Sequence, residues 1–172
     1  MKTHQLLHIL KFIFWLVFIG LLIKAGALVF NFGWSTWNPE GANNIYLGLD
    51  LFELRDTSIG QFAGVGSLLI SVVSLQAYIA YLVIKITNIG DITRPFTQEV
   101  AHLISKISHM ALTCGIISII ADQYCQRLVK NGFEIPITCG GKEFLFLAGV
   151  IFIISKVFQK GIELQTESDL TV

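Results

Sequence analysis

Four apolar runs constrain this chain more than any other feature. The first two, at about 12–33 and 62–86, are each long enough to cross the roughly 30 Å hydrocarbon core of a bilayer as a helix. Shorter runs follow at about 107–124 and 143–159. Only 14% of the 172 residues are charged, against about 25% in soluble domains. We therefore predict an all-α integral membrane protein, a four-helix bundle in the lipid bilayer formed by one domain, 1–172.

The first apolar run has two interpretations. Lys2 and Lys11 precede it, and Ala25-Gly26-Ala27 resembles a cleavage site, as in a signal peptide. However, apolar residues continue through Phe32, and further apolar runs follow. We favour an uncleaved first span.

The polar stretch 87–106 predicts a connector between the second and third spans. Thr97 is suited to cap a helix, and Glu99 would lie near the positive end of the helix dipole. Val100, Leu103 and Ile107 recur at helical spacing. We expect a short amphipathic helix at the membrane surface, leading into the third span.

The loop 34–61 is acidic, and its apolar residues alternate between Ile45 and Leu51. This period of two predicts a short extended segment, either resting on the helix ends or acting as a lid over a ligand. In the second span, small residues share one helix face: Gly60, Gly64, Ser67, Ser71 and Ser74. We expect this face to contact another helix of the same chain, with a homodimer interface as the alternative.

Four spans place both termini on one side. Basic residues concentrate in cytoplasmic loops of membrane proteins. Seven would lie on the side of the termini: Lys2, Lys11, Lys85, Arg94, Lys106, Lys156 and Lys160. Four would lie on the other: Arg55, Arg127, Lys130 and Lys142. We predict cytoplasmic termini, a cytoplasmic connector 87–106 and a cytoplasmic tail 161–172.

Lys24 falls near the middle of the first apolar run, where an ionisable group suggests a function. Asp122, near the end of the third run, is a candidate partner if the first and third spans touch. A small transporter or channel subunit that uses Lys24 is one interpretation. A structural ion pair, or a lysine whose amine reaches the membrane surface, is the other.

Three cysteines are present, and no two are spaced as Cys-x-x-Cys. Cys125 and Cys139 flank the last outer loop and could form a disulfide on an oxidising side. A quinone-linked thiol oxidase is a minor interpretation, because the first outer loop holds no cysteine.

Little else in the sequence indicates chemistry. The four histidines do not form a metal-ligand pattern, and no phosphate-binding loop or nucleophilic triad is visible. Twelve basic residues balance twelve acidic ones, which argues against direct nucleic-acid binding. We expect no enzyme activity, no metal and no cofactor.

Two segments resemble a known family. Arg94-Pro95-Phe96-Thr97-Gln98-Glu99, followed by Leu103 and Ile107, is similar to the connector of the bacterial membrane family called domain of unknown function 2975. The tail from Phe158 to Val172 resembles the acidic terminus of that family, with Ser168 where asparagine is usual. The resemblance implies a four-helix bacterial inner-membrane protein without an established activity. It also suggests a small helix-turn-helix regulator as a partner.

These observations predict a non-catalytic protein that displays its connector and tail to a cytoplasmic protein. The residues expected to dock the partner are Arg94, Pro95, Phe96, Thr97, Glu163, Leu164, Glu167, Asp169 and Leu170. Exposed charge pairs contribute only about 0–1 kcal/mol each. The aliphatic side chains of the tail would therefore supply most of the affinity.

Overall fold

The computed structural model describes the backbone of residues 3–89 and 97–170, and the side chains of 8–89, 97–165 and 167. Within these residues the chain is all α, with no strand. The four long helices are α1 (Thr3–Trp37), α3 (Ile59–Ile89), α4 (Gln98–Lys130) and α5 (Gly141–Leu170). Each holds a stretch long and apolar enough to span a membrane. This confirms the predicted all-α fold and identifies a multi-pass membrane protein.

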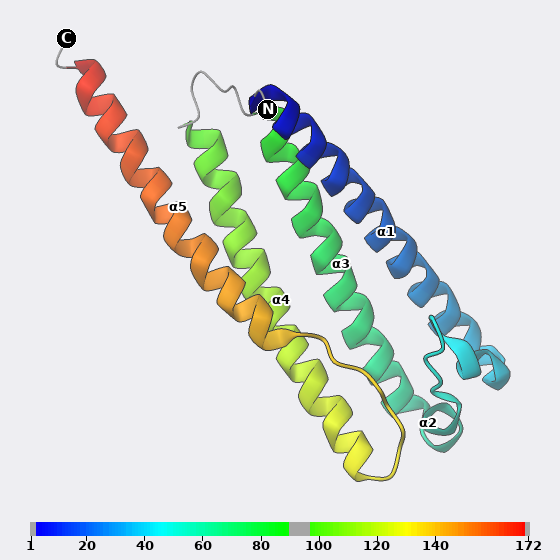
Figure 1. Ribbon diagram of the computed structural model, residues 1–172. Coiled ribbons are helices and arrows are strands. Elements are labelled where there is room, and N and C mark those ends of the chain that lie inside the picture. Colours follow the sequence, from blue (N-terminus) through cyan, green and yellow to red (C-terminus); the bar gives the residue numbers. More distant parts are fainter. Residues whose placement is uncertain (1–2, 90–96, 171–172) are drawn as a thin grey trace.

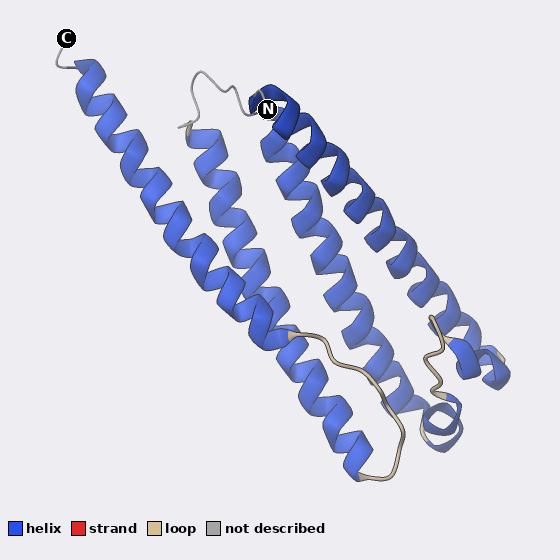
Figure 2. Cartoon of the chain, viewed as in Figure 1, coloured by secondary structure: helices blue, strands red, loops and turns tan. Residues whose placement is uncertain are grey.

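The four helices lie side by side in the order α1, α3, α4, α5 (Figures 1 and 2). Only neighbours in this row contact one another among the described helices, so α1 and α5 form its edges. The first residues of α1 and α4 and the last residues of α3 and α5 share one end, which we call the terminal end. The segments 38–58 and 131–140 share the opposite end, called the loop end.

Small residues let the helices approach closely at three points. A side chain on Gly66 of α3 would lie 2.6 Å from the Phe32 ring of α1. Gly115 of α4 faces Leu145 of α5. The Ser108 hydroxyl donates to the Ala148 carbonyl, 3.2 Å away across the α4–α5 contact. Close packing and interhelical hydrogen bonds drive helix association in lipid, so these contacts hold α1 against α3 and α4 against α5.

The predicted small-residue stripe is not the contact between helices. Ser67, Ser71 and Ser74 are exposed, and nothing approaches Gly60. Of the two glycines, Gly64 meets another helix, at the Tyr124 ring. The Ser67 and Ser71 hydroxyls donate to carbonyls of their own helix. Other faces of α3 are buried instead, because they carry larger apolar residues that bury more surface. These residues are Phe62, Val65, Val72, Val73 and Leu82.

The amphipathic stretch after Thr97 is not a separate helix. Thr97 caps α4, its hydroxyl oxygen accepting from the Val100 N–H at 3.3 Å. From there α4 continues unbroken to Lys130. Leu103 and Ile107 pack against Leu82 of α3. The predicted apolar stripe therefore faces a neighbouring helix rather than lying separately on the membrane surface.

The loop end contains a short 3₁₀ helix, η1 (Pro39–Asn44), and a short helix, α2 (Phe52–Thr57). The predicted extended segment at 45–51 is instead a tight turn. Leu47 and Gly48 have φ angles of 48° and 85°, and the Ile45 N–H donates to the Leu49 carbonyl at 2.8 Å. At the other end, residues 161–170 of the predicted tail are the last turns of α5.

Candidate functional site at the loop end

Arg55 fastens α2 to the end of α1. Its guanidinium donates to the carbonyls of Ser35 and Thr36, at 3.0 and 2.9 Å. The last carbonyls of a helix lack intrahelical partners and carry partial negative charge, so a cation there is favourable. Leu51 and Leu54 are buried in the same core as Phe32 and Phe62. The loop is therefore a packed cap on α1 and α3.

A side chain of α1 fixes the turn at 45–49. Asn31 donates to the Ile45 carbonyl at 2.6 Å, and Ile45 is fully buried. This bond places Tyr46 over Lys24, with the Lys24 amine 5.8 Å from the centre of the Tyr46 ring. An amine over an aromatic face is attracted by the negative face of the ring.

The segment 131–140 runs back along α4 instead of leaving the row (Figure 1). It turns at Gly132, whose φ of 103° favours glycine, and it buries Ile135. It ends at Gly141, where an added side chain would lie 2.7 Å from the backbone nitrogen of Ile119. Helix α5 therefore begins beside the middle of α4.

Asp122 stabilises this returning segment. Its carboxylate accepts from the Cys139 N–H at 2.6 Å. Asp122 does not pair with Lys24: α1 and α4 are not in contact, and the described side chains form no ion pair between them. The carboxylate instead satisfies a backbone donor of a non-helical segment, where an unpaired N–H is costly.

A cavity of about 320 Å³ lies around Lys24. Its walls come from α1, the 45–49 turn, α3 and the returning segment. The polar side chains on its wall are those of Lys24, Tyr46 and Thr138. The other lining residues are Leu28, Leu47, Gly48, Leu49, Leu69, Val73, Pro136 and Ile137. The 45–49 turn thus forms part of a cavity wall.

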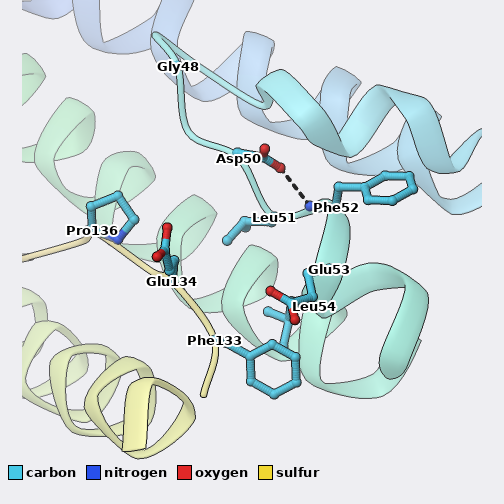
Figure 3. Close-up of a pocket in the computed structure, with 9 residues that line it drawn as sticks. All are labelled: Gly48, Asp50, Leu51, Phe52, Glu53, Leu54, Phe133, Glu134 and Pro136. Atoms are coloured by element: carbon cyan, nitrogen blue, oxygen red, sulfur yellow. Dashed lines mark hydrogen bonds between the residues drawn. The ribbon is translucent and has the colours of Figure 1, made fainter. Parts of the chain in front are cut away.

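An adjoining cavity of about 340 Å³ shares Gly48 and Pro136 with the first. Figure 3 shows the carboxylates of Glu53 and Glu134 beside it. The Asp50 carboxylate accepts from the Phe52 N–H at 2.9 Å, which fixes the start of α2 (Figure 3). The remaining lining residues are Leu51, Leu54 and Phe133.

Cys125 and Cys139, the predicted disulfide pair, are free thiols in the structure. Burial, followed by the Asp122 carboxylate and Cys125, raises the pKa of Cys139 from 9.0 to about 12, although Lys24 opposes the change. The nucleophilic form of cysteine is the thiolate, which is scarce at neutral pH when the pKa is this high. Lys24, Asp122 and the two thiols therefore share one electrostatic environment.

The predicted docking residues divide between described and undescribed positions. Arg94, Pro95 and Phe96 lie outside the described residues, as do the side chains of Asp169 and Leu170. Thr97 is the cap of α4. Glu163 pairs with Lys160 at 2.9 Å. The Glu167 side chain is exposed, and Leu164 is 56% exposed.

Sequence reasoning found Lys24 but not the cavity around it. Tyr46 and Thr138 gave no signal of their own, because each depends on a turn that brings it back to α1. The one available hint was the shortness of the fourth apolar run, about fifteen residues in 144–158. A short run is consistent with a last helix that begins late, beside the middle of α4.

A known family model matches the part of the chain that holds α4, α5 and nearly all of α3. The model of the family described as protein of unknown function (DUF2975) matches residues 62–172, well over half of the chain. The chain belongs to this family. The DUF2975 match covers Asp122, Cys125 and Cys139, whereas Lys24 and Tyr46 precede it. No curated protein and no solved structure matches the chain.

Proposed function

We propose that this DUF2975 member is a non-catalytic bacterial inner-membrane protein that presents the end of α5 to a cytoplasmic partner. The supporting observation is the length of α5 beyond its neighbour. Ser108 meets Ala148, so the first residue of α4, ten residues earlier, lies level with about residue 158. Helix α5 continues to Leu170, about 18 Å farther at 1.5 Å per residue.

The projecting helix has the composition of a docking surface. Leu164 is an exposed apolar side chain, with the carboxylates of Glu163 and Glu167 on either side of it in the sequence. An apolar residue flanked by charges provides affinity through burial and selectivity through charge. The family resemblance suggests a small helix-turn-helix regulator as the protein that binds there.

A cytoplasmic terminal end is part of this proposal. Five basic residues with described side chains lie in the half of their helix nearer that end: Lys11, Lys85, Lys106, Lys156 and Lys160. Arg55, Arg127 and Lys130 belong to the loop end, while Lys142 follows Gly141 beside the middle of α4. The positive-inside rule favours the terminal end as the cytoplasmic one.

The thiol-oxidase interpretation receives no support from the loop end. Such an enzyme needs a thiolate that attacks readily, and the raised pKa of Cys139 opposes this.

The transporter or channel interpretation depends on Lys24, which lines a cavity at one end of the row.

Affinity purification from detergent-solubilised membranes tests the proposed function. We expect a partner to co-purify with the full chain and to be lost on truncation after Gly161 and in Leu164→Lys. Gln165→Ala is the matched control, because Gln165 is also exposed on the same turn. Recovery of the same proteins with the truncated chain would reject the docking role of α5.

A further inference from the structure

We propose that the cavity around Lys24 is a water-filled site that binds the anionic group, a carboxylate or a phosphate, of a small ligand. The proposal stands apart from the docking role of α5. It rests on Lys24, on the Thr138 backbone and on the open cavity that both of them line.

Lys24 is a half-buried cation without a carboxylate partner. No described carboxylate oxygen lies within 4.0 Å of its amine. The amine lies over the Tyr46 ring instead. A charge in the middle of an apolar helix costs several kcal/mol unless water or a counter-charge stabilises it. The cavity that Lys24 lines provides the space for both.

Thr138 supplies further donors to the same cavity from an exposed position. Its N–H, carbonyl and hydroxyl have no hydrogen-bond partner within the described chain. Backbone groups of this kind are normally paired with protein or with ordered water. Non-helical backbone beside a membrane helix is tolerated where it lines a water-filled cavity, and Thr138 lines the same cavity as Lys24.

The volume fits a small ligand. About 320 Å³ is at the lower end of the range for small-molecule sites. Lys24 would bind the anionic group, and the unpaired N–H of Thr138 would donate to it. Apolar side chains, among them Leu28, Leu69 and Val73, would exclude other water around it.

The carboxylates of the adjoining cavity repel anions, which opposes the attraction by Lys24. Asp50, Glu53 and Glu134 are exposed, so salt screens their charge more than that of the half-buried Lys24. A test must therefore measure how much Lys24 itself changes the preference of the cavity for anions over cations, rather than the absolute preference.

Thiol labelling measures that change. Thr138→Cys, made with Cys139→Ser, is treated with an anionic and a cationic methanethiosulfonate reagent of similar size, using the purified full chain. We expect Lys24→Met to lower the ratio of anionic to cationic rates by about tenfold or more. Lys24→Arg should keep the ratio, which also shows that loss of folding is not the cause.

Asn43→Cys is the matched control. Asn43 is exposed at the loop end and lines neither cavity, so its labelling ratio should not respond to Lys24→Met. The proposal is overturned if the ratio at Thr138→Cys is equally insensitive. It is also overturned if neither reagent reaches Thr138→Cys, because the cavity would then be dry.

Two further arms distinguish the source of the anionic group. If a lipid phosphate occupies the site, labelling will be slow in phosphatidylglycerol vesicles and fast in a maltoside detergent. If the ligand is a free solute, labelling will be fast in both, and added acetate or inorganic phosphate will slow it. No effect of lipid, acetate or phosphate would reject binding of an anionic group.

Discussion

Cys139 provides the most direct test at the scale of single residues. Its thiol stays protonated until the pH approaches its pKa of about 12. Alkylation depends on the thiolate, so the rate at Cys139 should keep rising up to about pH 11, about tenfold per pH unit. Peptide mass spectrometry after iodoacetamide treatment measures this rate in the unmodified chain.

Thr138→Cys with Cys139→Ser supplies the control thiol, one residue away and exposed. With an ordinary pKa near 8.5, its alkylation rate should level off by about pH 10. A plateau of the Cys139 rate at the same pH would contradict the raised pKa.

The residue scale also shows where sequence reasoning stopped. Lys24 was identified because a charge within an apolar run is conspicuous. Its surroundings were not, because the contacts of Lys24 and Asp122 come from segments remote in sequence, Tyr46 and Cys139. When each span is considered as a separate helix, a charged residue is expected to pair with a charge on another helix. Contacts with loops that fold back against the helices are then missed.

Among the elements, the start of α5 is the most constrained point. A side chain on Gly141 would lie 2.6 Å from a side-chain carbon of Ile119 and 2.7 Å from its backbone nitrogen. The backbone of α4 cannot move aside easily, so we expect Gly141→Ala to destabilise the fold by about 1–3 kcal/mol. Thermal unfolding in detergent measures the loss.

Gly149→Ala is the comparison, because nothing lies within 4 Å of the position and it is inside a helix. Alanine is favoured over glycine there by about 1 kcal/mol, so this variant should be equal or more stable. Equal stability of the two variants would show that α5 does not rest on α4 at Gly141.

The existence of the four long helices was predictable, whereas their lengths and the two short helices η1 and α2 were not. Apolar runs and the Thr97 cap located all four helices, since these signals are local. The polar ends of α4 and α5 are helical because they continue a helix already formed, which costs less than starting one. The turn at Leu47 and Gly48 reversed a period-two prediction, because turn geometry overrides alternation.

At the scale of the whole molecule, the proposed orientation is open to a reporter test. With the terminal end in the cytoplasm, a green fluorescent protein fused after Val172 should fluoresce. Alkaline phosphatase, whose disulfides need an oxidising compartment, should be inactive at the same position. Phosphatase activity at the C-terminal fusion, without fluorescence, would reverse the orientation.

Phosphatase inserted after Asn43 should give the opposite result, because Asn43 is exposed at the loop end. The two fusions together separate a reversed protein from one that is not inserted. An uninserted chain would not place its two ends in different compartments.

The late start of α5 has a mechanical consequence for the molecule. The cavity wall leads from Thr138 through two glycines directly into a single helix of 30 residues, about 45 Å long. A helix is stiff along its axis, so the fixed position of Gly141 against α4 also sets how far Leu164 projects at the terminal end.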